Sequence, residues 1–205
     1  MLPVFLKMTE VPVLVVGGGT VAAHKVAWLL GEGARVRLIA KEVGPAVMRL
    51  TAEGTALQVE ARAFRSEDLE GVRLVIAATD DEAVNAHVAQ EATRRGLWVN
   101  VVDRPQLCSF YVPATGSVGP VQLAVGTNGL APALAGALRD LLIAQVPSGI
   151  ETFAEALREL RPALREQGLG FEDRAAVLRR LARLVAEEGR PLALEPLRQW
   201  LRAHI

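Results

Sequence analysis

Hydrophobic residues in the first hundred positions fall into short strand-like runs that alternate with segments of helical periodicity. The run Val11–Val16 is apolar without alternation and ends in three glycines, which is typical of a strand buried on both faces. Apolar positions then recur at helical spacing over 21–30 and stop at two glycines, where a helix is expected to end. By the same criteria we predict strands over 11–16, 35–40, 56–61, 74–78 and 97–102, and helices over 21–30, 43–52 and 82–95.

This alternation predicts an α/β fold with a Rossmann-type parallel sheet, covered by helices on both faces and built from right-handed βαβ units. The pattern changes after Asp103. Strands are expected at 109–112 and 122–125, then a helix at 132–144, and from 150 onward only helical patterns, interrupted at Pro162, Gly168, Gly170 and Pro191. We therefore expect a nucleotide-binding domain over 1–112, a small α/β segment over 113–147 and a helical domain over 148–205.

Charge and cysteine content narrow the class of protein. Acidic and basic residues balance at 23 each, so no strong net field attracts nucleic acid or an anionic membrane. Cys108 is the only cysteine, which excludes a disulfide framework within one chain. No stretch approaches the ~20 apolar residues of a membrane helix, and the apolar start breaks at Lys7, too early for a signal-peptide core. We expect a soluble, cytoplasmic protein that binds neither nucleic acid nor membrane.

The glycines after the first strand match the dinucleotide-binding pattern G-x-G-x-x-A. Gly17 permits a tight turn out of the strand, Gly19 lets the backbone approach a pyrophosphate, and Ala22 lets the helix pack closely on the sheet. The phosphates would then face free N–H groups at the start of the helix. Because the motif lies between a buried strand and a helix, with further βα units behind it, we favour a cofactor site over a plain glycine-rich turn.

The choice between NAD and NADP stays open. An acid usually follows the second strand and binds the ribose hydroxyls, and here that strand ends before Lys41 and Glu42. Glu42 is suited to the ribose if the loop turns back, whereas Lys41 and Arg37 are suited to a 2′-phosphate. For Arg37 a solvated position on the surface is an equal alternative.

The end of the fourth strand carries a second polar group, Thr79-Asp80-Asp81. Ligands of open α/β sheets bind at the carboxyl ends of the strands, so Thr79 is a candidate donor to a ribose or a phosphate. Asp80 and Asp81 suit the positive end of the next helix dipole, and for both we favour this capping role over a contact with the cofactor.

Five segments in unbroken order resemble the precorrin-2 dehydrogenase family, which includes the amino-terminal part of siroheme synthase and a bifunctional fungal relative. The resemblance covers about residues 1–147 and is faint beyond them. It rests on these segments: Leu2–Phe5, Val15–Gly19, Ala77–Asp81, Asn100–Asp103 and Cys108–Phe110.

The resemblance implies NAD-dependent oxidation of precorrin-2 to sirohydrochlorin, on the route to siroheme and in some organisms to cobalamin. It also implies a homodimer in which the segment 113–147 forms much of the contact. The key aspartate of the family falls on Asp103, and its cofactor contacts fall on Thr20, Val21, Lys41 and Glu42. Loss of a hydride from the macrocycle also releases a proton, so Asp103 is a candidate general base; the alternative is that it braces the turn before Pro105.

The tetrapyrrole that the resemblance implies carries eight carboxylates, so basic residues are expected around its pocket. Arg104, directly after the aspartate, and Arg139 are candidates, although basic residues on helices are mostly solvated. The expected substrate loop is Thr127-Asn128-Gly129. It departs from the hydroxyl-rich loop of relatives by keeping Gly129 and Pro132 and losing hydroxyls. Thr127 matches a serine that is phosphorylated in one branch of the family.

Some family members also insert iron into sirohydrochlorin, and the sequence offers little for that step. Stable metal sites usually cluster His, Cys or carboxylates, whereas His24, His87 and His204 are widely separated. Cys108 has no histidine near it in sequence and fits a small loop hydrophobe better than a nucleophile. We expect no dedicated metal site and leave chelatase activity open.

Two other function classes fit the glycine turn. A non-catalytic NAD(P)-sensing Rossmann module explains the turn but not the run from Asn100 to Phe110. An NAD(P)-dependent oxidoreductase for another small substrate would need room for a catalytic domain, and the short middle segment argues mildly against it.

Overall fold

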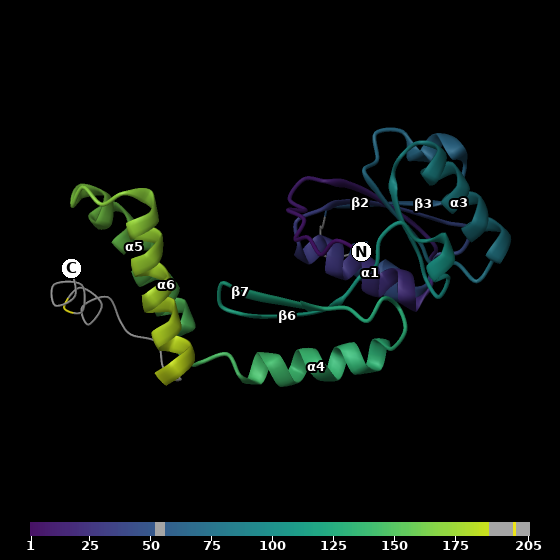
Figure 1. Cartoon of the computed structure of the whole chain (residues 1–205). Coiled ribbons are helices and arrows are strands. Elements are labelled where there is room, and N and C mark those ends of the chain that lie inside the picture. The colour runs from purple at the N-terminus through teal and green to yellow at the C-terminus, as the bar shows by residue number, and fades with distance from the viewer. Residues whose placement is uncertain (52–55, 189–198, 200–205) are drawn as a thin grey trace. The chain divides into compact units, whose positions relative to one another are not determined.

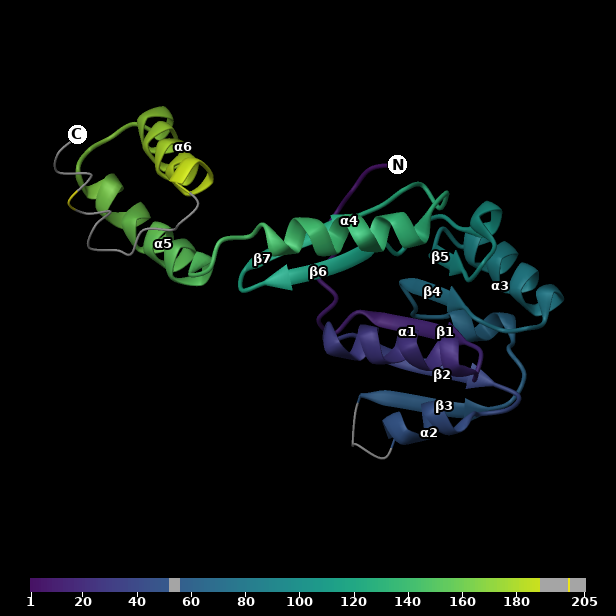
Figure 2. The ribbon, with the colours of Figure 1, turned by 90° about the horizontal axis from the view of Figure 1, so that it is seen from below.

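The computed structural model describes residues 1–51, 56–188 and Gln199. The chain divides into two compact units, Met1–Val112 and Pro113–Ile205, and each is described by itself. Figure 1 and Figure 2 together label the helices and strands along the chain. The assignment of separate roles to 1–112, 113–147 and 148–205 stays a prediction.

The first unit is built on a five-stranded sheet whose strands all run parallel, in the order β3-β2-β1-β4-β5. This order places β1 at the centre, with crossovers to either side, which is the Rossmann-type arrangement that the sequence predicts. The strands are β1 (Pro12–Val16), β2 (Arg35–Ala40), β3 (Leu57–Ala61), β4 (Leu74–Ala77) and β5 (Trp98–Val101). The helices are α1 (Thr20–Gly31), α2 (Pro45–Thr51) and α3 (Glu82–Arg94), with 3-10 turns η1 (Ser66–Leu69) and η2 (Pro105–Leu107).

Two apolar layers form the core of this unit, one on each face of the sheet. Along β1, Val13 and Val15 face the layer that contains buried residues of α1 and α2. Leu14 and Val16 face the layer that contains buried residues of α3, because successive side chains of a strand point to opposite faces. Figure 2 shows the strands with α1 and α2 beside β1–β3 and α3 beside β5. A strand buried on both faces needs the uninterrupted apolar run that the sequence shows.

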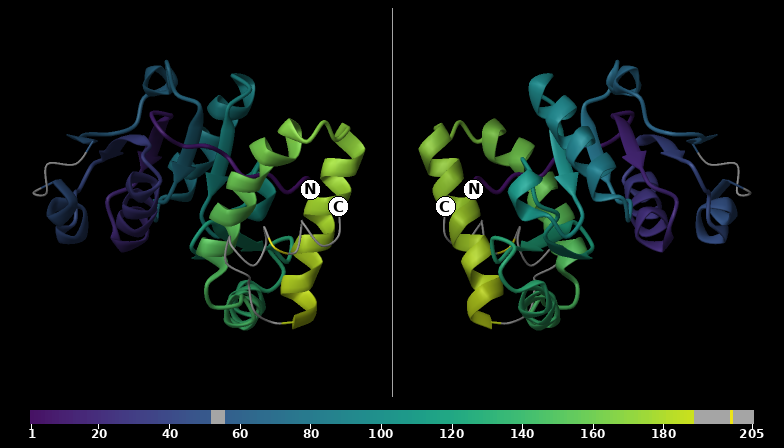
Figure 3. Two further views of the ribbon diagram at one scale, coloured as in Figure 1. Left: turned by 90° about the vertical axis from the view of Figure 1, so that its left-hand side faces the viewer. Right: turned by 90° about the vertical axis from the view of Figure 1, so that its right-hand side faces the viewer.

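Between residues 113 and 188 the second unit contains an antiparallel hairpin and three helices. The strands β6 (Ala114–Val118) and β7 (Val121–Val125) pair with each other, and α4 (Pro132–Ala144) packs against both. The helices α5 (Ile150–Glu166) and α6 (Phe171–Glu188) pack together around five buried side chains among the described residues. Figure 3 shows the two helices side by side. The five are Phe153, Ala156, Leu160, Leu164 and Leu181.

Two expectations from the sequence are wrong. Residues 109–112 form no strand, and the hairpin begins at Ala114 instead. The Ser109 N–H donates to the Val99 carbonyl at 2.8 Å, and the Ser109 hydroxyl accepts from the Val99 N–H. Pro113 also lacks the N–H that a strand continuing from 112 would use. Pro162 does not interrupt the helical pattern but lies inside α5, because the buried stripe that includes Leu160 and Leu164 continues past it. The break expected at Pro191 lies outside the described residues.

Within the described residues, no helix is both long enough and apolar enough to span a membrane.

Candidate nucleotide-binding and catalytic site

Gly17 makes the turn out of β1 possible. Its φ is +132°, a conformation that side chains rarely adopt, and its N–H donates to the Ile39 carbonyl at 2.9 Å. A Cβ at this position would lie 2.2 Å from the Ala78 carbonyl oxygen. The turn is therefore wedged between the carboxyl ends of β2 and β4, and only glycine fits.

Gly18 is the contact point for the loop that follows β2. A Cβ on Gly18 would lie 2.0 Å from the Glu42 carbonyl oxygen, and the Gly44 N–H donates to the Gly18 carbonyl at 2.9 Å. The backbone of the loop that carries Lys41 and Glu42 is thus held directly beside the glycine turn. This brings together two groups of predicted cofactor residues that are more than 20 positions apart.

Gly19 faces open space. A Cβ there would meet no atom within 4 Å, in contrast to the crowded positions before it. Gly19 is also the N-cap residue of α1, where no side chain caps the helix and the first turn carries no acid. The N–H groups of Thr20 and Val21 begin the helix, so its positive end is left for an anion from outside. A dinucleotide pyrophosphate fits both this space and this charge.

Asp81 caps α3, as favoured from the sequence: its carboxylate accepts from the N–H groups of Ala83 and Val84 at 3.0 and 3.2 Å. Thr79 makes its hydrogen bonds to residues close to it along the chain. Its hydroxyl lies 2.9 Å from Asn85 Oδ1 and accepts from the Asp81 N–H at 3.1 Å. The Asn85 amide in turn donates to the Thr79 carbonyl at 2.8 Å. Thr79 therefore holds the loop after β4 in shape, whatever its contact with the cofactor.

Asn85 is a residue of this region that sequence reasoning missed. It is only 5% exposed, and its side chain ties α3 to the loop at Thr79. The available signal was a polar residue on the otherwise apolar, buried face of the predicted helix, since a buried amide requires partners.

Asp103 lies in the turn after β5 and is exposed, with φ +58°. Non-glycine residues rarely adopt this conformation, and strain of this kind concentrates at functional sites. The turn is braced from within by Cys108, whose sulfur accepts from the Val101 N–H at 3.1 Å and lies 3.3 Å from the Arg104 carbonyl. Burial raises the pKa of the Cys108 thiol, so it stays a neutral donor and acceptor.

Two arginines that the sequence offered as ligand contacts are engaged within the protein. Arg37 donates to the Asp68 carbonyl and lies 4.0 Å from a Glu60 oxygen, so its partly exposed side chain is engaged with η1 and β3. Arg104 pairs with Glu82 at the start of α3. Its guanidinium is partly exposed and fixed beside the Asp103 turn.

The predicted substrate loop belongs to the second unit, between β7 and α4. Asn128 and Gly129 both have positive φ, +54° and +79°. The Thr127 hydroxyl accepts from the Ala131 N–H at 3.1 Å, which connects the loop to the start of α4. Arg139 donates to the Thr115 carbonyl at 2.8 Å and to Asp140, so it stabilises α4 on β6.

The histidines lie in separate surroundings. His24 is on α1, and His87 packs edge-to-face on Phe64. Across residues 1–51 and 56–188, no group of three or more His, Cys, Asp or Glu side chains is arranged to hold a metal ion. His204 lies outside the described residues.

The chain is similar to siroheme synthases. It is 44% identical over 165 residues to the siroheme synthase of Methylococcus capsulatus (strain Bath) and 42% identical over 166 residues to siroheme synthase 1 of Serratia proteamaculans. These matches cover 80% and 81% of this chain but only 35% of each relative. The chain thus spans about a third of the length of the curated relatives it matches.

A solved structure described as SirC, precorrin-2 dehydrogenase, is similar over nearly its whole length. It covers 99% of this chain and 98% of its own, with a TM-score of 0.73 and 26% identity. The resemblance that the motifs indicated is therefore confirmed by sequence relatives and by fold. Residues 4–114, which include the glycine turn and the Asp103 turn, match the family model described as “Putative NAD(P)-binding”, and the chain belongs to this NAD(P)-binding family.

Proposed function

We propose that this protein oxidises precorrin-2 to sirohydrochlorin with NAD as the hydride acceptor. The observation that carries the proposal is the strained turn that exposes the Asp103 carboxylate at the same sheet edge as the glycine turn. The siroheme synthase relatives and the precorrin-2 dehydrogenase that shares the fold supply the substrate class.

In this proposal the pyrophosphate lies over Gly17 and Gly19 and accepts from the N–H groups of Thr20 and Val21. The loop residues Lys41 and Glu42, held beside Gly18, contact the adenosine ribose. NAD is favoured over NADP because Arg37 is engaged with Asp68 and Glu60 and is not free for a 2′-phosphate. Thr79 contributes by shaping the loop next to the cofactor.

The bound cofactor supplies a hydride acceptor. Oxidation removes two hydrogens from the macrocycle: one leaves a carbon as hydride, and the other leaves as a proton. The Asp103 carboxylate accepts that proton and passes it to solvent, which its exposed position allows. Cys108 and the Arg104–Glu82 pair keep the turn in place while it does so.

Substrate contacts are proposed for Arg104 and for the loop Thr127-Asn128-Gly129. Positive φ at 128 and 129 turns the backbone sharply there. In such a turn, backbone N–H groups can be directed at a carboxylate.

We further propose that the working form is a cytoplasmic homodimer joined through the second unit. A two-stranded hairpin with one helix buries little apolar area, and α4 leaves four leucines exposed, which is typical of an interface. They are Leu134, Leu138, Leu141 and Leu142.

The test is an anaerobic assay of purified protein with precorrin-2 and NAD or NADP, followed by the absorbance of sirohydrochlorin. We expect turnover with NAD, and a loss of at least ~100-fold in kcat for Asp103→Asn with NAD affinity unchanged. Failure of the unmodified protein to oxidise precorrin-2 with either cofactor, while still binding NAD, would point to a sensing module instead. A parallel assay with Fe²⁺ and sirohydrochlorin asks whether the same chain inserts iron.

A further inference from the structure

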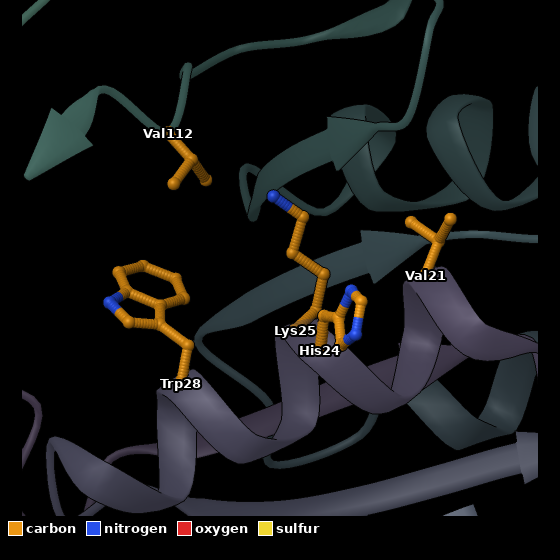
Figure 4. A pocket seen from close by; sticks show the side chains of 5 residues that line it. All are labelled: Val21, His24, Lys25, Trp28 and Val112. Atoms are coloured by element: carbon orange, nitrogen blue, oxygen red, sulfur yellow. The ribbon is translucent and has the colours of Figure 1, made fainter. Parts of the chain in front are cut away.

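The first unit contains a pocket on α1 that shares only Val21 with the proposed cofactor contacts. It has a volume of about 260 Å³ and is lined by Val21, His24, Lys25, Trp28 and Val112. Four of these five residues recur at helical spacing on one face of α1. Figure 4 shows the Lys25 side chain extending away from α1 beside Trp28, with its ammonium group at the far end.

Lys25 is partly buried. No hydrogen bond or ion pair joins its ammonium group to any residue that the structure describes. Burial lowers the pKa of Lys25, and the charge of Asp103 acts in the opposite direction. The Asp103 carboxylate is therefore close enough to this ammonium group for their charges to interact.

Several arginines of the same unit form ion pairs with acids of the fold. Arg62 pairs with Asp68 and Glu60, Arg95 with Glu91, and Arg104 with Glu82. Holding a cation away from water without a partner costs free energy. For Lys25 no hydrogen bond or ion pair with a described residue offsets that cost. Such a group is suited to an anion that arrives from outside.

The walls of the pocket indicate what kind of anion. Val21, Trp28 and Val112 offer apolar and aromatic surface around the one ammonium group. A small inorganic anion would gain little from them, whereas a flat ring system with carboxylate arms can place the ring on Trp28 and an arm on Lys25.

We propose that Lys25 is a substrate-binding residue that holds a carboxylate arm of the tetrapyrrole, with the Trp28 side chain against the macrocycle. The proposal rests on the proposed function for the identity of the substrate. It adds an anchor on α1 that fixes the ring edge beside Asp103, so binding and proton removal are assigned to different residues.

The experiment compares Lys25→Met, Lys25→Arg and the control Lys7→Met. The control makes the same change at an exposed lysine that lines a different pocket of this unit, together with Met8 and Trp98. Binding of uroporphyrin, a porphyrin with eight carboxylates, is followed by fluorescence. The KM and kcat for precorrin-2 are measured with saturating NAD.

We expect Lys25→Met to weaken uroporphyrin binding and raise KM by about 10- to 100-fold, the value of one charge-assisted hydrogen bond. The kcat and the affinity for NAD should change by less than about threefold. Lys25→Arg should restore most of the binding, and Lys7→Met should match the unmodified protein. Lys25→Met should also unfold at the same temperature as the unmodified protein or higher, because it removes a buried charge without removing volume.

Equal KM and equal uroporphyrin affinity in Lys25→Met and the unmodified protein would overturn the inference while leaving the proposed function intact. The opposite outcome, in which the proposed function fails, can be told apart from this one. If the unmodified protein does not oxidise precorrin-2 but binds uroporphyrin in a manner that depends on Lys25, the proposed reaction fails and the anion pocket stands.

Discussion

The two units of this chain bury their hydrophobic residues in different ways. In the first unit every residue of β4 is buried, and β1 is buried on both faces between two apolar layers. In the second unit β6 and β7 alternate between partly buried and exposed residues, and α4 buries only Ala135. The first unit therefore has a hydrophobic core of its own, whereas the hairpin and α4 bury few residues between them.

This difference matches a division of tasks. The glycine turn and the Asp103 turn need backbone positions fixed to within fractions of an ångström, which a rigid sheet provides. An exposed helical face beside a short hairpin suits association with another molecule. The comparison can be tested by making the same kind of change in each unit.

The largest contrast is expected for glycine-to-alanine substitutions. Gly18→Ala places a methyl group 2.0 Å from the Glu42 carbonyl oxygen, so the loop after β2 must move. We expect at least ~100-fold weaker NAD binding by calorimetry, together with a lower unfolding temperature. In α4, Gly136→Ala meets nothing within 4 Å and should stabilise the helix by about 0.5–1 kcal/mol.

Gly19→Ala separates binding from folding within the same turn. Its methyl group meets no protein atom, so the unfolding temperature should stay near that of the unmodified protein while NAD affinity falls, because the added group occupies the space proposed for the pyrophosphate. Unchanged NAD affinity in Gly19→Ala would contradict the placement of the phosphates.

A second contrast concerns exposed hydrophobic residues on helices. Leu134 on α4 and Met48 on α2 are both 53% exposed, so a glutamate at either position should leave the fold of its own unit intact. We expect Leu134→Glu to weaken a dimer at least ~10-fold, because a charge would be buried at the interface, and Met48→Glu to have no effect. Light scattering over a dilution series measures both, and an equal response of the two variants would rule out α4 as the dimer contact.

The smallest effect is expected at Cys108. Its sulfur braces the turn that carries Asp103, so Cys108→Ala should cost about 1 kcal/mol of unfolding free energy and lower kcat a few-fold. Cys108→Ser keeps a donor and an acceptor and should retain more activity than the alanine variant. If both variants have the same kcat as the unmodified protein, the turn holds its shape without this contact.

The strands and the glycine turn of the first unit were predictable because they depend on local signals. Continuous apolar runs predict strands buried on both faces, and Gly17 and Gly19 mark the turn before α1. The same reasoning failed at 109–112 and at Pro162. In the first case Ser109 bonds to the edge of β5, and in the second the packing of Leu160 and Leu164 outweighs the helix-breaking tendency of proline.

By itself the sequence determined the class of fold, the place of the cofactor turn and the family resemblance, since strand periodicity and motif spacing are properties of neighbouring residues. The tertiary structure alone decided which charged side chains have partners within the fold. Arg37 and Arg104 were candidates from their positions in the sequence, and both are paired with acids far along the chain. Lys25 belongs to no motif of the sequence, yet it lies partly buried in the pocket on α1, where no hydrogen bond or ion pair joins it to a described residue and the charge of Asp103 acts on it. Whether a charged side chain is available to a ligand depends on what the fold brings next to it, and no local pattern records that.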